Sequence, residues 1–169
     1  VGAVYSGIPI SYGRREAGFM LRRTRAKVLV VPERYRDRDV IGFAGELAGE
    51  TEHLRCVVVL GESPCDPGWM SFEELTQRPS QACATPEETP AGALVHLGFT
   101  SGTTGEPKAV MNTHQTLDAV LTGWVEHVGR STLGERPVNL VCSPIGHHTG
   151  FLWGVLLSAY VQGTAVCLD

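Results

Sequence analysis

The sequence has few lysines and no surplus of positive charge. Only Lys27 and Lys108 occur in 169 residues, and 14 basic against 18 acidic side chains give a formal net charge of −4. Because nucleic acids attract proteins with a strong positive field, this balance disfavours a nucleic-acid partner. Nine of the basic residues lie between Arg14 and Arg38 beside three acids. A solvated helix face followed by a charged loop accounts for that segment.

Paired cysteines are also lacking. The five cysteines form no C-x-x-C pair and are odd in number, which disfavours a disulfide framework. Cys56, Cys142 and Cys167 lie in apolar runs, so we predict that they are small buried side chains of the core. The N-terminal residues do not lead from a charged region into an apolar stretch, which disfavours a signal peptide. These features favour a reducing, cytoplasmic location.

Charged residues are absent from Pro137 to Leu168, a stretch longer than the roughly 20 residues that span a bilayer. Pro144, Gly146 and Gly163 divide this stretch into three short pieces. Buried strands around a buried helix fit such interruptions better than a transmembrane helix does.

Apolar runs and helical spacings alternate along the chain. Strands are predicted at Ala26–Val31, Arg55–Leu60, Ala93–Phe99, Val138–Cys142 and Thr164–Leu168, and helices at Asp39–Glu50, Thr113–Val128 and Phe151–Val161. Residues 62–92 read as a long connection in which Ser71 caps a short turn. Strands that alternate with helices predict an α/β fold with a mostly parallel sheet. One helical stripe is expected to pack on that sheet: Leu117, Val120, Leu121, Trp124 and Val128.

The most specific pattern lies between the strand that ends near Phe99 and the helix that begins near Thr113. From Leu97 to Val110 the sequence is L-G-F-T-S-G-T-T-G-E-P-K-A-V. Glycine lets the backbone approach a phosphate, hydroxyl and amide groups donate to its oxygens, and Lys108 supplies positive charge. We therefore predict a strand–loop–helix element that binds polyphosphate through Thr100, Ser101, Gly102, Thr103, Thr104, Gly105 and Lys108.

Two common glycine-rich motifs do not fit this loop. A nucleotide P-loop needs G-x-x-x-x-G-K-[ST], but Pro107 stands five residues after Gly102, and Ala109 follows the lysine. A serine-hydrolase elbow needs glycines two residues on either side of its serine, where Ser101 has Phe99 and Thr103. The alternative is a turn with no binding function. Twelve specified positions that end in Pro-Lys favour a binding loop over such a turn.

Leu97 to Lys108 resembles, at every position, the signature of the adenylate-forming (AMP-binding) superfamily of acyl-CoA synthetases, peptide-synthetase adenylation domains and luciferases. Ala109 stands just outside the signature, where the family commonly has glycine. Gly2 to Tyr12 is similar to the family's upstream segment, and Ser143 to Phe151, S-P-I-G-H-H-T-G-F, is similar to its P-x-x-H-x-x-G segment. The resemblance implies part of the large N-terminal domain of this fold, with a mostly parallel sheet and flanking helices.

In this resemblance His147 matches the family histidine that lies beside the acyl pocket and the adenylate. The resemblance thus implies Lys108 and His147 as catalytic residues, and His147, Gly150 and Phe151 as residues of the substrate pocket. A metal site at His147 and His148 is not expected, because adjacent residues point apart and no nearby Cys, Asp or Glu completes a ligand set. Surface or packing roles are expected for the remaining histidines: His53, His96, His114 and His127.

The resemblance also implies a reaction. A carboxylate attacks the α-phosphorus of ATP, with Mg²⁺, to give an acyl-adenylate and pyrophosphate, and coenzyme A then displaces AMP. The N-T-H-Q-T run and the segment after Ser143 look most like those of short- and medium-chain fatty-acid or cyclohexanecarboxylate-CoA ligases. Three alternatives remain open: an aromatic-acid ligase, an adenylation domain with another acceptor, and a non-catalytic nucleotide- or phosphate-binding module.

Several parts that the family uses have no counterpart in residues 1–169. Nothing resembles its Tyr-Gly-x-Thr-Glu segment, its ribose-binding aspartate, its hinge or the lysine of its small C-terminal domain. We therefore expect an incomplete N-terminal AMP-binding domain that does not form acyl-adenylate by itself. The apolar runs Val28–Val31, Val57–Leu60 and Val138–Cys142 suit strands buried on both faces, so we expect uncovered apolar faces.

Overall fold

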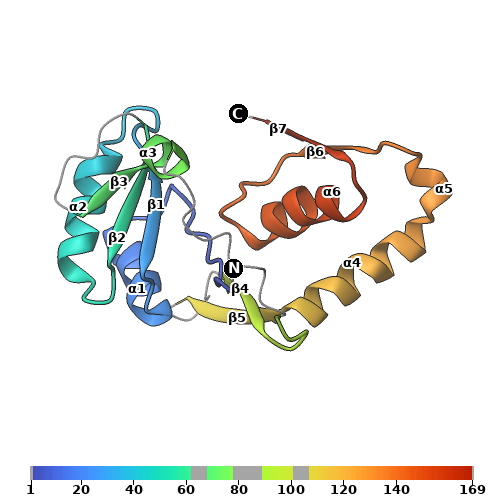
Figure 1. Cartoon of the computed structure of the whole chain (residues 1–169), viewed down its shortest axis with the longest axis horizontal. Helices are drawn as coiled ribbons and strands as arrows, with labels where there is room; N and C mark the ends of the chain where they lie inside the picture. The colour runs from blue at the N-terminus through green and yellow to red at the C-terminus, as the bar shows by residue number, and fades with distance from the viewer. Residues whose placement is uncertain (1, 62–67, 78–88, 101–106, 169) are drawn as a thin grey trace. The chain divides into compact units, whose positions relative to one another are not determined.

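The computed structural model describes residues 2–61, 68–77, 89–100 and 107–168, and Figure 1 labels their helices and strands. The chain divides into two compact units. The first, Tyr12–Ala84, is called the arginine-rich unit below. The second combines Val1–Ser11 with Thr85–Asp169 and is called the hairpin unit.

The arginine-rich unit contains a parallel three-stranded sheet in the order β1 (Val28–Pro32), β2 (Cys56–Leu60), β3 (Trp69–Ser71). Its helices are α1 (Arg14–Thr24), α2 (Val40–Glu50) and α3 (Phe72–Gln77). Helix α2 lies against the sheet (Figure 1), and their shared core consists of Val31, Val40, Ala44, Val57 and Val59. The predicted order of strand, helix and strand is confirmed here.

Polar side chains cap the starts of two of these helices, and the cap by Ser71 is the one that the sequence predicts. The Asp39 carboxylate accepts a hydrogen bond from the Gly42 amide at 2.9 Å, and the Ser71 hydroxyl accepts one from the Glu74 amide at 3.0 Å. Such caps satisfy amide groups that have no partner within the helix. Helix α1 presents Arg14 to Glu46 and Glu50 of α2 as exposed ion pairs. The basic segment therefore begins as a helix, in agreement with the sequence interpretation.

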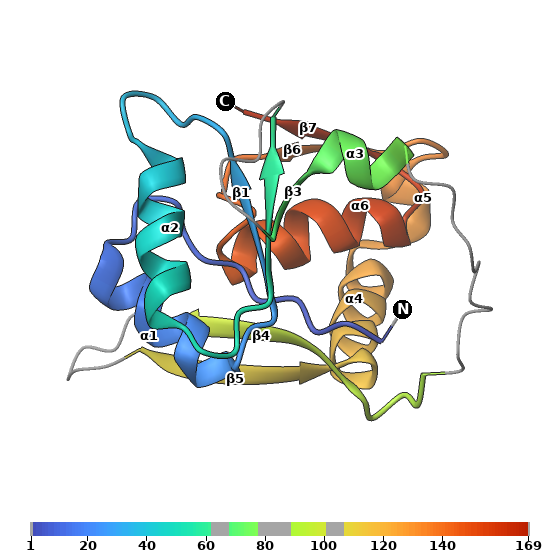
Figure 2. The same cartoon turned by 60° about the vertical axis from the view of Figure 1, so that its left-hand side comes forward.

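The hairpin unit contains two small sheets and the remaining helices. Strands β4 (Leu94–Thr100) and β5 (Lys108–Thr113) pair antiparallel, whereas β6 (Val138–Val141) and β7 (Thr164–Cys167) pair parallel. The helices are α4 (His114–Val128), the short α5 (Arg130–Leu133), the π-helix η1 (Gly150–Leu156) and α6 (Leu157–Tyr160), all labelled or followed by colour in Figure 2.

Strand β5 corrects the predicted strand–loop–helix element. The chain does not run from the glycine-rich loop into α4 but first returns along β4, with Thr100 opposite Lys108 and Leu94 opposite Thr113. The Thr113 side chain then caps α4, where its hydroxyl accepts a hydrogen bond from the Thr116 amide at 3.2 Å. The start of the predicted helix is confirmed, and the loop connects two paired strands instead of a strand and a helix.

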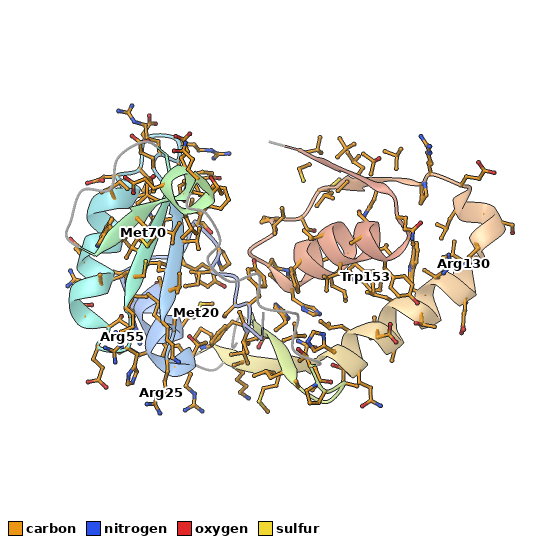
Figure 3. All side chains as sticks on the ribbon, in the orientation of Figure 1. Met20, Arg25, Arg55, Met70, Arg130 and Trp153 are labelled. Carbon is orange, nitrogen blue, oxygen red and sulfur yellow. The ribbon has the colours of Figure 1, made fainter. Side chains whose placement is uncertain are left out.

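Helix α4 packs mainly on other helices and less on a sheet than predicted, since Val95 of β4 is only partly buried against the same core. Its buried residues Leu117, Leu121 and Val125 meet Leu152 of η1 and Leu157 of α6. Val120 of the predicted stripe is exposed, because the face that meets two helices is displaced toward Val125. Trp153 of η1, labelled in Figure 3, also contacts α4, with its ring centroid 6.1 Å from that of Trp124.

Several strands have one apolar face that is uncovered, as expected from the sequence. Val28 and Val30 of β1 are 54% and 55% exposed, and Val138 and Leu140 of β6 are 70% and 56% exposed. The same lack of cover makes the core prediction for two thiols wrong. Cys142 and Cys167 are exposed, and Cys56 is half-buried.

Within the described ranges, no helix is both long enough and apolar enough to cross a membrane. The charge-free stretch after Pro137 forms β6, η1, α6 and β7. Its division into short elements follows the interruptions at Pro144, Gly146 and Gly163.

Candidate active site

The two ends of the glycine-rich loop are held together at the loop end of the β4–β5 hairpin. Thr100, the last residue of β4, lies opposite Lys108, the first residue of β5. The Thr100 hydroxyl donates a hydrogen bond to the Lys108 carbonyl at 3.4 Å. Both residues are exposed. The hairpin therefore places a hydroxyl and an ammonium group on neighbouring strands at the base of the loop.

The other predicted phosphate-binding residues, Ser101, Gly102, Thr103, Thr104 and Gly105, lie outside the described residues. Their predicted exposure toward a cleft is thus not tested. Among the described residues Lys108 has no ion-pair partner. A lysine that neutralises no carboxylate of its own unit can place its charge on a ligand.

His147 lies in a tight turn that leads directly into η1. Its amide donates to the Pro144 carbonyl at 2.9 Å, and its carbonyl accepts from the Phe151 amide at 3.0 Å. The Thr149 amide donates to Nδ1 of His147 at 3.2 Å. Since Nδ1 accepts this bond, the proton of the neutral ring is on Nε2. The exposed imidazole can therefore offer an N–H donor to a ligand.

Close backbone approaches hold the His147 turn in place. A Cβ on Gly150 would lie 2.5 Å from the Ser143 carbonyl oxygen and closer still to that of Pro144. A Cβ on Gly146 would lie 3.0 Å from the Ile8 carbonyl oxygen. The Tyr5 hydroxyl donates to the Ile145 carbonyl at 3.2 Å. Residues near the start of the chain thus support the turn that carries His147.

Phe151 is the second residue of η1, as predicted, but its ring belongs to an aromatic cluster. Its centroid lies 4.5 Å from that of Tyr5 and 4.6 Å from that of His96. The His96 ring in turn stacks on His148, with 5.0 Å between centroids. We call these four side chains, Tyr5, His96, His148 and Phe151, the ring cluster.

Strand β4 joins the ring cluster to the hairpin. The Tyr5 amide donates to the Val95 carbonyl, and the Leu97 amide donates to the Tyr5 carbonyl, each at 2.9 Å. A Cβ on Gly98 would lie 3.0 Å from the His96 ring and 3.4 Å from Cβ of His148. The strand that ends at the glycine-rich loop therefore also contacts the turn that carries His147. The two predicted parts of the site share one strand.

Sequence reasoning missed Tyr5 and His96. His96 is 1% exposed, which fits the packing role among the expectations for it, but its stacking on His148 and Phe151 was not predicted. Its alternation with Gly98 on β4 is the one local signal, because two residues apart on a strand share a face. Nothing in the sequence indicates that Tyr5 pairs with a strand ninety residues later.

Burial alters the titration of the ring cluster. Burial, and secondarily the nearby His148, lowers the pKa of His96 to about 4. Burial, and then the charge of His147, lowers the pKa of His148, while burial raises the pKa of Tyr5. All three rings are therefore neutral near pH 7. Within the described residues no group of three or more His, Cys, Asp or Glu could hold a metal ion.

Comparison with known proteins identifies the family. The family model described as AMP-binding enzyme matches residues 1–169, which is the whole chain. The chain belongs to the AMP-binding enzyme family. The medium-chain fatty-acid–CoA ligase of Escherichia coli is 26% identical over 169 residues, covering 100% of this chain and 29% of the relative. The peroxisomal benzoate–CoA ligase of Arabidopsis thaliana is 29% identical, covering 99% of this chain and 30% of the relative.

Solved structures agree with this AMP-binding fold. The anthranilate CoA ligase AuaEII, in complex with anthranoyl-AMP, matches with a TM-score of 0.80 and 24% identity over 99% of this chain and 30% of its own. ATP-bound MatB from Rhodopseudomonas palustris matches with a TM-score of 0.74 and 22% identity over 98% of this chain and 30% of its own. The chain spans about three tenths of the length of these relatives.

Proposed function

We propose that the chain is part of an enzyme that activates a small carboxylic acid with ATP and transfers the acyl group to coenzyme A. One observation carries the proposal. In a member of the AMP-binding family, the hairpin sets Thr100 and Lys108 side by side at the base of a loop with a complete family signature. The relatives named above as CoA ligases support the same activity.

Two balanced steps make up the proposed reaction. A carboxylate oxygen bonds to the α-phosphorus of ATP while the bond to the bridging oxygen of pyrophosphate breaks, which gives acyl-adenylate and pyrophosphate. The thiol sulfur of coenzyme A then bonds to the acyl carbon. The bond from that carbon to the AMP oxygen breaks, and the thiol proton is released. Lys108 offsets the charge that develops on the leaving phosphates.

The described residues fit ATP better than they fit a protein-held metal. Thr100 supplies a hydroxyl and Lys108 an ammonium group, both suited to phosphate oxygens. Since the described residues hold no cluster of metal ligands, Mg²⁺ would be carried mainly by the phosphates of ATP, as is common for this ion. Bound there, Mg²⁺ would neutralise phosphate charge.

His147 and Phe151 are proposed to face the acid. The Thr149 amide fixes Nδ1 of His147, so Nε2–H is the donor that can orient a carboxylate or an acyl carbonyl. The sequence favours a short- or medium-chain or alicyclic acid, and the E. coli relative supports that choice. An aromatic acid is the second candidate, supported by the Arabidopsis relative and by the anthranilate ligase fold.

The extent of the domain and the location of the enzyme are also proposed. Because the chain spans about three tenths of its relatives and leaves apolar strand faces uncovered, we propose that residues 1–169 are an incomplete N-terminal AMP-binding domain. The cysteine pattern supports a cytoplasmic enzyme. The activity measurements below therefore use the intact protein that carries this chain.

Lys108→Ala tests the phosphate role, with Lys27→Ala as a matched control. Lys27 is the only other lysine and is exposed in the arginine-rich unit. ATP–pyrophosphate exchange dependent on added acid should fall about 10²–10³-fold in Lys108→Ala, the usual effect of losing one transition-state partner. Lys27→Ala should match the parent. Exchange by the parent with no acid preference, or equal rates in both variants, contradicts the proposal, and ATP binding without exchange supports the non-catalytic module.

Phe151→Ala tests the position of the acid. Removal of a ring from the proposed acyl wall should change the preference among butyrate, octanoate, cyclohexanecarboxylate and benzoate by about 1–3 kcal/mol in kcat/KM. A preference profile identical to that of the parent would place Phe151 away from the acid.

A further inference from the structure

His96 is an unusual residue for the interior of a strand. It is 1% exposed on β4 and lies directly opposite Asn112 of β5. Residues opposite each other in an antiparallel pair project from the same face of the sheet. Nδ2 of Asn112 lies 3.1 Å from Nδ1 of His96. The buried imidazole therefore has one fixed polar partner across the hairpin.

This contact fixes both the tautomer and the orientation of the ring. An amide nitrogen only donates, so Nδ1 of His96 accepts and the proton of the neutral ring is on Nε2. A phenylalanine at position 96 could fill the same space but would accept no hydrogen bond from Asn112. The hydrogen bond thus adds to packing a constraint on the His96 plane that an apolar side chain would lack.

The plane of His96 is the surface on which the His147 turn lies. The rings of His148 and Phe151 stack on it at interplanar angles of 22° and 26°. These two residues flank the turn, because His148 follows His147 and the Phe151 amide donates to the His147 carbonyl. Gly98 leaves the space that both histidine rings occupy. A change in the plane of His96 would therefore move His148 and Phe151, the residues that flank the His147 turn.

Among the described residues, the groups that contact the His96 ring are neutral. Asn112 faces it from β5, Tyr5 from the N-terminal segment, His148 from the turn and Phe151 from η1. Tyr5 and His148 are the titratable groups among them. No carboxylate among the described residues is in contact with the His96 ring, so an imidazolium there would have no counter-ion. The arrangement suits a neutral ring.

We propose that Asn112 and His96 are positioning residues, whose hydrogen bond sets the plane on which His148 and Phe151 stack and thereby the placement of His147 toward the acid. The proposal rests on the proposed function for its link to the acid. Its structural part, a neutral His96 with its proton on Nε2 that holds the turn, stands without that link.

Asn112→Asp is the sharpest perturbation. A carboxylate only accepts, so Nδ1 of His96 must carry a proton, and the nearby negative charge raises the pKa of His96. Below that pKa the ring is an imidazolium. Because the buried charge of this imidazolium lies against the rings of His148 and Phe151, it should disturb their stacking although the hydrogen bond is kept. In the intact protein we expect the KM for the acid to rise on the order of 10-fold at low pH and to recover as pH increases, with the KM for ATP unchanged. The parent, with His96 neutral above about pH 5, should show no such recovery.

Two further variants separate positioning from packing and from charge. His96→Phe keeps a ring but loses the hydrogen bond, so the acid KM should rise without the pH dependence while thermal stability changes little. Gln115→Glu adds the same charge at an exposed residue three positions from Asn112 and should behave as the parent. A parental acid KM in both His96→Phe and Asn112→Asp would overturn the positioning role.

Nitrogen-15 NMR of the histidine rings tests the structural part independently of activity. In the parent, Nδ1 of His96 should be the unprotonated nitrogen, and in Asn112→Asp it should be protonated. His96→Phe should shift the ring signals of His147 and His148. Nδ1–H in the parent, or unchanged His147 signals in His96→Phe, would refute the proposal even if the protein shows no exchange. Absence of exchange with the expected NMR results would refute only the proposed function.

Discussion

Gly150 and Gly123 form a matched pair that tests the packing of the hairpin unit. Gly150 is buried at the start of η1, where a Cβ would lie 2.5 Å from the Ser143 carbonyl oxygen and closer to that of Pro144. Backbone atoms cannot rotate away as a side chain can. Gly123 is exposed in the middle of α4, and a Cβ there would meet nothing within 4 Å.

Opposite signs are therefore expected for the same chemical change. Gly150→Ala should lower the free energy of unfolding by about 1–3 kcal/mol, the usual cost of overpacking. Gly123→Ala should raise it by about 0.5–1 kcal/mol, because alanine loses less backbone entropy in a helix. At about 2–4 °C per kcal/mol, the midpoints should move down by roughly 2–12 °C and up by roughly 1–4 °C.

Tryptophan fluorescence can report on the hairpin unit alone. Trp124 and Trp153 belong to it, and Trp69 belongs to the arginine-rich unit. In the 169-residue chain with Trp69→Phe, thermal unfolding followed by fluorescence reports on the unit that contains both glycines. If Gly150→Ala were as stable as its parent while Gly123→Ala gained stability, the close approach of η1 to Ser143 and Pro144 would be wrong.

Two more expectations concern pH and exposed apolar area. Burial, and secondarily His148, lowers the pKa of His96 from 6.5 to about 4, so the unfolded chain binds more protons between these values. The free energy of unfolding should fall by at most about 3 kcal/mol as pH drops through this window. If the free energy of unfolding of His96→Phe depended on pH as steeply as that of the parent, His96 would not be the cause. The double variant Val138→Thr/Leu140→Thr should reduce self-association of the 169-residue chain, measured by sedimentation velocity. Unchanged association would show that the exposed face of β6 is not the surface that associates.

Local signals in the sequence predicted much of the fold. Asp39, Ser71 and Thr113 were readable as helix starts because each has a side-chain oxygen that can accept a nearby amide. The strands β1 and β2 were readable because they are short, apolar and bounded by Pro32 and Gly61. In each case the determining interaction lies within a few residues of the signal.

Features that depend on pairing between distant residues could not be predicted from the sequence. Strand β5 exposes Ala109, Val110 and Met111, so it shows no buried alternation, and only its pairing with β4 defines it. Helix α4 was given the wrong main partner because an apolar stripe fits a sheet or another helix equally well. Apolar runs likewise predicted buried thiols at Cys142 and Cys167, although a run does not show which of its faces is covered.

The candidate site was predicted in part for the same reason. Lys108 and His147 stand in recognisable motifs. Strand β4 pairs with the strand that begins at Lys108 and also contacts His148, the residue after His147. The supporting residues carry no motif, because their contacts join positions 5, 96, 112 and 148 through stacking and one hydrogen bond. The five signature residues from Ser101 to Gly105 lie outside the described residues, so their predicted role remains a prediction.

Strand β4 links the proposed contacts of the two substrates of the adenylation step, ATP and the acid. Its C-terminal end holds the loop proposed to bind phosphate, and its middle carries His96, which contacts the residues on either side of His147. A strand within a hairpin is stiff along its length, since β5 pairs with it from Leu94 to Thr100. The loop proposed to bind phosphate and the ring that supports the His147 turn are thus attached to the same paired strand. In the proposed enzyme this arrangement would hold ATP and the acid in a constant relative position, which is the condition under which proximity accelerates a reaction.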